Sequence, residues 1–409
     1  LRVRSSPPNV TLDMRGRLEA PSTVFPHPTL VAMDRRRFLR DAPVLGAGAA
    51  LGAACAGDPA EANAPAVQTA ERIRWRLASS FPRSAEIIYR ASEHLAERVS
   101  ALTAGRFQIR AYPAGELVPG LQVLDAVQNR TVAIGHTAGY YYLGKNEALA
   151  FETGVPFGMT ARQHNAWMTD GGGLDATRGL LADFGIVNFP GGNTGVQMGG
   201  WFREPVETMA DLQGLKMRIP GLGARVMDRL GVNALTLAGG EIFQALERGA
   251  IDATEWIGPY DDEKLGFFKV ATNYYFPGWW EPSAMLSFYV NQADYDALPS
   301  SYQAALDVAA AEANARMLAE YDAQNPAALA RLLDAGVTLR PFAEAILTAA
   351  QGASMAMFEE TAMANPTYRS VYDGYRQFQL ASRRWFDVAE QGYARYQSLR
   401  SDFQSDGTA

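Results

Sequence analysis

The chain has 409 residues, a length that predicts two domains rather than one small core. Its hydrophobic content of 48% and charged content of 20% are those of an ordinary globular protein. The formal net charge of −7, with no basic stripe among the aromatic residues, argues against nucleic acid as a partner.

The amino-terminal segment has the features of an export signal. Arginines at 35–37 precede a small-residue apolar run at 42–54, which is too short to span a bilayer. The segment resembles a bacterial twin-arginine (Tat) signal, although Asp34 stands where Ser or Thr is usual. We therefore expect 1–70 to be a leader and a disordered linker, and the protein to be exported to the periplasm. The only cysteine, Cys55, lies in this leader, which excludes disulfides and thiolate metal sites.

The segment from 73 to 139 alternates between strand and helix patterns. Strands are predicted where apolar residues alternate, and helices where they recur at helical spacing. The strands are expected at 73–81, 107–113 and 132–139, and the helices at 84–105 and 120–131. This rhythm predicts a mainly parallel sheet with helices on its faces, which binds ligands beyond the carboxyl ends of its strands.

A second run of the same pattern begins near residue 196. Two such units predict an α/β protein with two lobes, each a mixed sheet flanked by helices, and a cleft between them. We expect 71–193 and 285–345 to form the first lobe and 194–284 the second. The strands of the second run are expected at 196–202, 216–220, 234–237, 251–256 and 284–291, and its helices at 209–215, 221–231 and 240–250.

The carboxyl end is predicted to be a helical region, 346–409, that contains a long helix. Its apolar residues fall near one stripe. Two interpretations stay open: packing on its own lobe, or contact with a second subunit in a homodimer. The stripe consists of Tyr368, Val371, Tyr372, Tyr375, Phe378, Trp385, Val388, Gly392, Tyr396 and Leu399.

Few residues could support catalysis. The three histidines after the leader form no zinc-binding motif, and neither a nucleophile elbow nor a P-loop occurs. The segment 221–226, GLGARV, is placed like a dinucleotide-binding turn, but Val226 stands where the third glycine belongs. The sequence favours a binding protein over an enzyme, with an exported nucleotide-dependent oxidoreductase as the alternative.

Several polar residues could instead bind a small anion and a cation. Arg218 is expected at a strand end, where a guanidinium can hold a carboxylate with two parallel hydrogen bonds. Asn193 and Gln197 lie among glycines, and their amide oxygens suit hard cations. The alternative interpretations are a surface arginine and a polar turn.

Aromatic residues are candidates for the wall of such a pocket. They are Phe81, at the end of the first strand, Tyr141 in GYYYLGK, and Trp279 in FPGWWEP, which also contains Glu281. Large aromatics in short loops often only fill a domain edge, and consecutive tyrosines in a strand cannot all face one side.

The segment DATEWIGPYDD, 252–262, places Glu255 beside Trp256. A buried glutamate needs a partner, and a cation could be that partner. The Trp256 side chain would then belong to the pocket wall or to the lobe interior. Asp261 and Asp262 are interpreted as solvated residues that begin the next helix.

Four segments, GGNTGVQMGGWF, GLKMRIPGLGARVMDRLG, GGEIFQALERGAIDATEWIGPYDD and YFPGWWEP, carry a family resemblance. Together they resemble the substrate-binding proteins of TRAP transporters (tripartite ATP-independent periplasmic transporters). The resemblance runs from about 75 to nearly 390 and is strongest to the group that binds 2-oxo acids and lactate with a metal ion. It implies a two-lobed periplasmic binding fold that closes on a small carboxylate and delivers it to a membrane permease.

The resemblance also implies roles for particular residues. Arg218 would hold the substrate carboxylate, while Gln197, Glu255 and the Trp256 carbonyl would bind the ion, with Glu281 as a further ligand. A set of oxygen ligands suits Na⁺ or Ca²⁺, and a second carboxylate would favour Ca²⁺.

Two departures accompany the resemblance. Asn193 is an alternative to Gln197, because this segment aligns with slippage between subgroups. Trp279-Trp280 stands where typical relatives have a Trp-His or Tyr-Gln pair.

The group includes dimers joined through a long carboxyl-terminal helix, which favours the homodimer interpretation of that helix.

Overall fold

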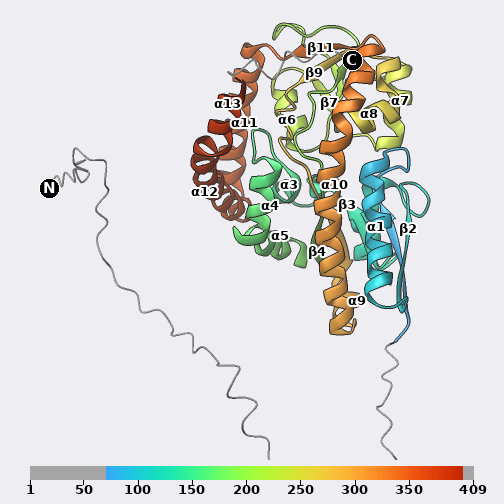
Figure 1. Ribbon diagram of the computed structural model, residues 1–409. Helices are drawn as coiled ribbons and strands as arrows, with labels where there is room; N and C mark the ends of the chain where they lie inside the picture. The colour runs from blue at the N-terminus through green and yellow to red at the C-terminus, as the bar shows by residue number, and fades with distance from the viewer. Residues whose placement is uncertain (1–70, 399–409) are drawn as a thin grey trace, which may run out of the picture. The chain divides into compact units, whose positions relative to one another are not determined.

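The computed structural model describes residues 71–398 (Figure 1). The leader predicted at 1–70 and the last residues, 399–409, lie outside the described residues. Two β-sheets flanked by helices make up the described part and form the two lobes of the expected fold. None of its helices is both long and apolar enough to span a bilayer.

The first sheet has five strands in the order β2-β1-β3-β10-β4. β1 runs parallel to β2 and β3, whereas β10 is antiparallel to both of its neighbours, so the sheet is mixed. The strands are β1 Ile73–Ser79, β2 Phe107–Tyr112, β3 Ile134–Thr137, β4 Ile186–Asn193 and β10 Met285–Asn291.

The helices of the first lobe cover this sheet. α1, Glu86–Leu102, shows why they form: Ile87, Ala91, Leu95 and Val99 recur every four residues and are buried on one face. That face packs on β2 and on α10, Ser300–Asp334 (Figure 1). The others are α2 Val123–Gln128, α3 Ala150–Thr153, α4 Ala161–Asp170, α5 Gly173–Ala182, α9 Gln292–Asp296 and short 3-10 turns at Gly120–Gln122, Gly139–Tyr142 and Glu147–Leu149.

β4 is the strand of the first sheet that the sequence patterns did not indicate. Pro190 lacks a backbone N–H, and the glycines after it suggested a turn. β4 lies at the sheet edge and pairs only with β10, where the register shifts between Pro190 and Gly192. A bulge at Gly191 and the edge position together accommodate the proline.

The second sheet has six strands in the order β11-β9-β5-β8-β6-β7. β6 runs parallel to β7 and β8, whereas β5 is antiparallel to β8 and β9. The strands are β5 Trp201–Phe202, β6 Lys216–Arg218, β7 Asn233–Leu235, β8 Ala253–Thr254, β9 Asn273–Phe276 and β11 Thr338–Pro341. The helices are α6 Gly221–Arg229, α7 Gly239–Glu247, α8 Pro259–Leu265 and the 3-10 turn Phe267–Lys269.

The predicted second part of the first lobe, 285–345, is too long, because it includes β11. Residues 338–341 pair in parallel with β9, in the second sheet rather than the first. The long helix α10 explains the difference, because it packs on α1 and β4 with one part and on α8 with another. It thereby carries the chain from one lobe to the other before β11 begins.

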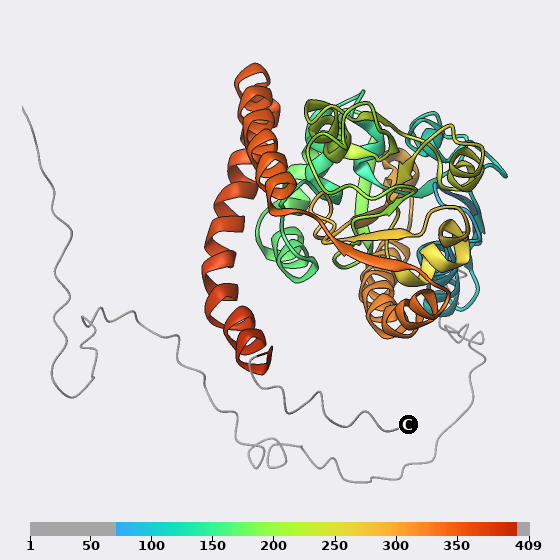
Figure 2. The same cartoon turned by 90° about the horizontal axis from the view of Figure 1, so that it is seen from above.

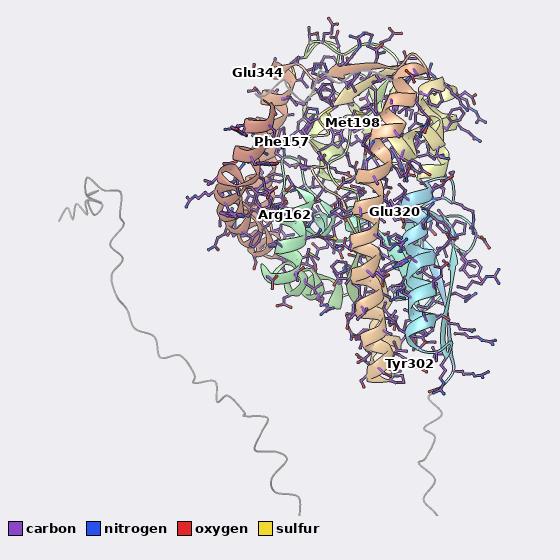
Figure 3. All side chains as sticks on the ribbon, in the orientation of Figure 1. Phe157, Arg162, Met198, Tyr302, Glu320 and Glu344 are labelled. Carbon is purple, nitrogen blue, oxygen red and sulfur yellow. The ribbon has the colours of Figure 1, made fainter. Side chains whose placement is uncertain are left out.

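Two residues through which α10 contacts the first lobe are labelled in Figure 3. Tyr302 lies near one end of this helix, and Glu320 lies farther along it, beside α1. Glu320 forms an ion pair with Arg90 of α1 at 3.1 Å, and the Tyr302 hydroxyl donates to the Glu71 carbonyl at 2.9 Å.

Two predicted elements of the second lobe form differently. The strand expected at 196–202 is reduced to β5, because 196–200 is part of a crossing between the sheets. The helix expected at 209–215 is a series of turns, in which the Asp211 carboxylate accepts from the Thr208 N–H at 2.8 Å. A side chain that binds the backbone locally in this way competes with helix formation.

The carboxyl-terminal region consists of α11 Glu344–Ala364, α12 Pro366–Val388 and α13 Glu390–Ser398. These helices lie along one side of the molecule (Figure 2). In the predicted stripe, Tyr368, Val371, Tyr372 and Tyr375 are buried, while Trp385, Val388 and Tyr396 are exposed and Leu399 lies outside the described residues. The first part of the stripe therefore packs on its own fold, and the second part faces outward.

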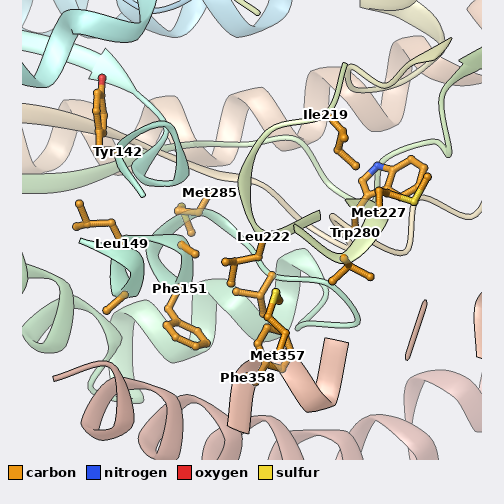
Figure 4. Packing of buried hydrophobic residues seen from close by; sticks show 14 of the residues in the cluster. Tyr142, Leu149, Phe151, Ile219, Leu222, Met227, Trp280, Met285, Met357 and Phe358 are labelled. Carbon is orange, nitrogen blue, oxygen red and sulfur yellow. The ribbon is translucent and has the colours of Figure 1, made fainter. Parts of the chain in front are cut away.

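Buried apolar side chains join the two lobes to the carboxyl-terminal helices. Figure 4 shows Phe151 of α3, Leu222 of α6 and Met357 and Phe358 of α11 close together. All four belong to one buried cluster. Because this cluster draws on both lobes and on α11, the end of the chain is part of the core rather than an appendage.

Candidate functional site

The chain crosses between the two sheets at 194–200 and 277–284, and these crossings lie side by side. The Gln197 N–H donates to the Glu281 carbonyl at 3.2 Å, and the Gly278 N–H donates to the Gln197 carbonyl at 3.0 Å. A Cβ on Gly278 would lie 2.5 Å from that carbonyl oxygen, so the close approach requires glycine. Gln197 and Glu281 are thereby held where the lobes meet.

Arg218 ends β6 and is almost fully buried. Its Nε donates to the Leu237 carbonyl at 3.1 Å, and its Nη1 forms an ion pair with the Glu255 carboxylate. The two side chains are each 1% exposed. Nη2 is buried without a hydrogen-bond partner within residues 71–398. A buried, unpaired guanidinium N–H is suited to receive the carboxylate of a ligand.

Glu255 reaches Arg218 because their strands end at the same edge of the second sheet. β6 and β8 are parallel, with Arg218 opposite Thr254. The Glu255 N–H also donates to the Arg218 carbonyl at 3.2 Å. The sequence assigned a cation as the partner of Glu255, whereas in this structure the partner is Arg218.

Two oxygen atoms in the same region accept no hydrogen bond. Gln197 donates its Nε2–H to Thr194 Oγ1 at 3.3 Å, which leaves its Oε1 buried and unpaired. No hydrogen bond in the described part of the chain is donated to the Trp256 carbonyl, whereas the Glu255 carbonyl accepts two. Buried oxygens of this kind cost free energy unless a ligand or cation meets them.

These groups lie at a narrow pocket between the lobes, with a free volume of about 10 Å³. That volume is about the size of a single water molecule, so the pocket must widen before an organic ligand can enter. The predicted residues that line the pocket are Phe81, Tyr141, Gln197, Arg218 and Trp256. Its other lining residues are Ile88, Tyr140, Thr194, Ile257, Ala284 and Leu286.

Asn193 and Trp279 are not among the lining residues, in contrast to the expectation from the sequence. The expected ion ligands Glu255 and Glu281 do not line the pocket either, but they contact the lining residues Arg218 and Tyr140. Asn193 ends β4, where its Oδ1 accepts from the Gly195 N–H at 2.9 Å. The Trp279 ring stacks on Phe157, with ring centroids 5.2 Å apart. Trp279 therefore fills the domain edge, as large aromatics in short loops often do.

Tyr140 is a pocket residue that sequence reasoning did not single out. Its hydroxyl donates to Glu281 Oε2 at 3.4 Å, and its ring lies edge-on to Tyr141 at 5.0 Å. Two consecutive tyrosines reach one pocket because Gly139–Tyr142 is a 3-10 turn. The alternation that separates neighbours in a strand does not apply there.

Asp261 and Asp262 are buried, which corrects their interpretation as solvated residues. Both are 0% exposed. The Tyr321 hydroxyl donates to Asp261 at 2.5 Å, and the Trp201 indole N–H and the Tyr274 hydroxyl donate to Asp262 at 2.9 and 2.8 Å. Pro and Asp in a first helical turn are equally common on exposed helices, so the local sequence did not reveal this burial.

Burial shifts the protonation of both acids at the pocket. Burial raises the pKa of Glu255 to about 7, although the Arg218 charge opposes the shift. Burial, assisted by the charge of Glu255, raises the pKa of Glu281 well above its usual value. Both carboxyl groups are thereby held toward their neutral forms, and a cation beside them would favour their ionised forms.

The donor set also decides which cation fits. Within residues 71–398, no group of three or more His, Cys, Asp and Glu side chains is placed to hold a metal. A cation at the pocket would instead meet oxygens of mixed type, from Glu255, Glu281, Gln197 and the Trp256 carbonyl. This set fits a hard cation such as sodium or calcium and does not fit zinc.

Two other features do not form a site. In the GLGARV turn, a Cβ on Gly223 would lie 2.9 Å from the Trp280 Cβ, so packing explains that glycine without a nucleotide. A groove of about 250 Å³ between α1 and α10 is larger than the pocket, but charged residues there pair with each other, as Arg90 does with Glu320.

Two sheets that meet at a small polar pocket with a buried arginine define a two-lobed solute-binding protein. The family model for bacterial extracellular solute-binding proteins, family 7 (DctP), matches residues 78–364, and the chain belongs to this family.

Individual relatives agree with this assignment. A monocarboxylate 2-oxoacid-binding periplasmic protein of Nostoc sp. is 49% identical over 367 residues, which is 90% of this chain and 99% of the relative. A TRAP transporter solute-binding protein of Bordetella bronchiseptica is 48% identical with a TM-score of 0.79, over 80% of this chain and 98% of that chain. It was crystallised as a mixed-occupancy dimer, with calcium and picolinate in one site and the other site apo.

A third relative carries a different ion. A TRAP periplasmic solute-binding protein of Pseudoalteromonas atlantica is 38% identical with a TM-score of 0.77, over 80% of this chain and 99% of that chain. Its crystal structure contains sodium and pyruvate.

Proposed function

We propose that this protein is the periplasmic component of a TRAP transporter that captures a small 2-oxo acid, such as pyruvate, together with a metal ion. A 2-hydroxy acid such as lactate is the second ligand of the same class. The observation that carries the proposal is a set of groups that have no hydrogen-bond partner within residues 71–398 and belong to buried residues lining one pocket: Arg218 Nη2, Gln197 Oε1 and the Trp256 carbonyl.

The chemistry of a 2-oxo acid matches these groups. Its carboxylate would pair with Arg218, while a carboxylate oxygen and the 2-oxo oxygen would chelate a cation held by Glu255, Gln197 and Trp256. Picolinate and pyruvate, found in the two relatives, share a carboxylate beside a second lone-pair donor. Apolar and aromatic residues such as Phe81 and Leu286 close the remaining wall.

Charge balance favours calcium over sodium. Glu255, Glu281 and the ligand carboxylate would bring three negative charges to a buried site, and Arg218 brings one positive charge. A divalent ion neutralises the remainder, whereas sodium leaves one charge unbalanced. Sodium would balance the charges only if Glu281 did not contribute a charge at the ion.

The test is a calorimetric titration of the protein after exhaustive dialysis against a chelator. Pyruvate, lactate and longer 2-oxo acids are titrated with calcium, with sodium, and with neither ion. We expect pyruvate to bind in the presence of calcium, more weakly with sodium, and not detectably without either. If no carboxylate binds or raises the melting temperature under any ion, the proposal is wrong.

Delivery and export complete the proposal. The captured acid would pass to the membrane permease subunits of the transporter, after export of the protein by the Tat pathway. The twin arginines at 35–37 support Tat export. Retention of the precursor in cells that lack the Tat translocase would support this route, and processing there at the normal rate would contradict it.

We also propose that the protein forms a homodimer through its carboxyl-terminal helices. Leu380, Trp385, Val388 and Tyr393 are exposed apolar or aromatic side chains of α12 and α13. Exposed groups of this kind mark interaction surfaces. The dimeric crystal structure of the Bordetella relative adds support.

The alternative of an exported nucleotide-dependent oxidoreductase loses its support at the GLGARV turn. Gly221 lies against Tyr140, where a Cβ would be 3.3 Å from the tyrosine ring, and Gly223 lies against Trp280. The turn is thus packed against the pocket wall, and the family is one of transport-associated binding proteins.

A further inference from the structure

Asp262 contacts the peptide unit that carries the Trp256 carbonyl. Its Oδ1 accepts from the Ile257 N–H at 3.2 Å. That N–H and the Trp256 carbonyl belong to the same planar peptide. Asp262 is fully buried and is not among the residues that line the pocket. It can act on the pocket through this peptide, and its charge also contributes to the raised pKa of Glu255.

The Asp262 carboxylate is held firmly from its other side. The Trp201 indole N–H of β5 and the Tyr274 hydroxyl of β9 both donate to its Oδ2, and these two rings stack with centroids 3.9 Å apart. Three donors on one carboxylate leave it little freedom to turn. Its position is therefore set by the second sheet.

The geometry of a peptide bond passes this restraint to the carbonyl. In a trans peptide the N–H and the C=O lie in one plane and point in opposite directions. With the Ile257 N–H held by Asp262, the Trp256 carbonyl must point away from Asp262. The next peptide is fixed too, because the Met198 N–H donates to the Ile257 carbonyl at 2.9 Å.

We propose that Asp262 is a positioning residue for the cation site, which aims the Trp256 carbonyl at the ion by anchoring the N–H of the same peptide. The inference rests on the proposed function, because it requires the Trp256 carbonyl to be an ion ligand. Residues that orient metal ligands in this way typically contribute about 10–100-fold to metal affinity.

The first test is Asp262→Asn, which keeps the size of the side chain. The NH₂ group of asparagine is a donor, so it cannot accept the hydrogen bonds that a carboxylate oxygen accepts at that place. We expect its calcium dissociation constant, measured with pyruvate present, to rise about 10–100-fold. Terbium, a luminescent substitute for calcium, reports the number of bound waters through its lifetimes in H₂O and D₂O. We expect terbium in the variant to bind an additional water in place of the carbonyl.

The matched control is Asp261→Asn. Asp261 is the neighbouring residue with equal burial, but its partners are Tyr321 and the Ile87 N–H, and it makes no hydrogen bond to the 256–257 peptide. We expect calcium affinity and terbium hydration to stay at the wild-type level in this variant.

A second variant covers the case in which Asp262→Asn does not fold. Tyr274→Phe removes one donor to Asp262 and leaves every charge in place. We expect it to weaken calcium binding in the same direction by a smaller factor, again with added terbium hydration. Wild-type calcium affinity and hydration in Tyr274→Phe would count against the inference.

The outcomes separate this inference from the proposed function. A loss of affinity in Asp262→Asn without added water would assign the effect to charge alone and overturn the positioning role. The same loss in Asp261→Asn would also overturn it. Normal calcium binding in Asp262→Asn, with defective binding in Glu255→Gln, would refute this inference alone. If the wild type binds neither calcium nor terbium with pyruvate, the proposed function fails as well.

Discussion

Arg218 and Glu255 form an ion pair beside the pocket, on adjacent strand ends of one sheet. Water has almost no access to either side chain, so a ligand that draws one of them away would leave the other buried without a partner. A cation bound to Glu255 would leave Arg218 to a carboxylate, and a carboxylate bound to Arg218 would leave Glu255 to a cation. We therefore expect the two proposed ligands to bind cooperatively.

Two replacements of Arg218 should show how much of the pyruvate affinity depends on its positive charge and how much on the geometry of its guanidinium group. Arg218→Lys keeps the positive charge but loses the two-pronged donor set and the bond to the Leu237 carbonyl. We expect pyruvate affinity to fall by about 3 kcal/mol, on the order of 100-fold, in calorimetric titrations with calcium. Arg218→Gln should in addition lower stability by about 3–5 kcal/mol, because it leaves Glu255 buried and unpaired. Unchanged pyruvate affinity in both variants would remove Arg218 from its role.

Glu255→Gln should abolish the response to cations. In the wild type, calcium at 100 times its dissociation constant should stabilise the protein by about 2.7 kcal/mol. The variant lacks the charged ligand, so we expect calcium to leave its melting temperature unchanged and pyruvate affinity to fall in parallel. Glu360→Gln, at an exposed ion pair with Arg229, is the control and should respond like the wild type. A full calcium response in Glu255→Gln would contradict the assignment.

The sequence could predict those site residues that lie in short segments with a recognisable local pattern. Arg218 and Glu255 each end a segment with strand character, so both could be named as candidates from local pattern. Their ion pair was not predicted, because it depends on β6 and β8 being neighbours in the second sheet. Tyr140 was missed because a 3-10 turn, unlike a strand, allows neighbouring side chains to reach one pocket. Trp279 was misplaced because its contact with Phe157 depends on a segment far away in the sequence.

Long-range packing explains the remaining differences between the prediction from the sequence and the structure. Asp261 and Asp262 look like ordinary first-turn acids, and only the approach of Tyr321, Trp201 and Tyr274 shows that they are buried. β11 joins the second sheet because α10 spans both lobes, which no local pattern encodes. Local propensity thus predicted most elements, but tertiary contacts decided which neighbours they have.

The titration of Asp261 should make the stability of the protein depend on pH. Burial raises the pKa of Asp261 to about 6, although hydrogen bonds from Tyr321 and the Ile87 N–H oppose the shift. In the unfolded chain the pKa is about 4, so the folded state binds the proton more tightly between these values. This contribution to stability is fully present below about pH 4 and is lost as the pH rises through about 6.

Asp261→Asn removes this titration. We expect the free energy of unfolding of the variant, relative to the wild type, to rise by about 2 kcal/mol between about pH 4 and pH 7. Urea unfolding of both proteins across this range measures it, and their difference cancels the other titrating groups. Parallel pH profiles would show that Asp261 titrates alike in the folded and unfolded states.

The proposed dimer should depend on the exposed part of α12. Trp385 and Val388 are 62% and 75% exposed, so a charge at either position should not disturb the monomer. We expect the double variant Trp385→Glu, Val388→Glu to weaken dimerisation by at least about 2 kcal/mol, roughly 30-fold, in sedimentation or light-scattering experiments. Leu102→Glu, at an exposed apolar residue of α1, is the control and should leave the oligomeric state unchanged. A double variant that dimerises as the wild type does would place the interface elsewhere.

Two adjacent glycines at the start of α7 test the position of Trp256. A Cβ on Gly239 would lie 2.4 Å from Cη2 of the Trp256 ring, whereas a Cβ on Gly240 would have only the Pro82 Cβ nearby, at 4.0 Å. The Trp256 ring lines the pocket, and the Arg218 guanidinium carbon lies 5.2 Å from its centroid. Gly239→Ala should therefore push the ring toward Arg218 and the ligand, at a cost of about 1–3 kcal/mol.

Gly240→Ala makes the same chemical change without the collision. Alanine favours a helix over glycine by about 1 kcal/mol, so this variant should unfold at an equal or higher temperature and bind pyruvate with calcium as the wild type does. Gly239→Ala gains the same helix propensity but should bind pyruvate about 10-fold more weakly, since roughly 1.4 kcal/mol of the strain would fall on the bound state. Equal affinities in the two variants would mean that the Trp256 ring can move without consequence, and that the carbonyl of Trp256, rather than its side chain, is what the pocket requires.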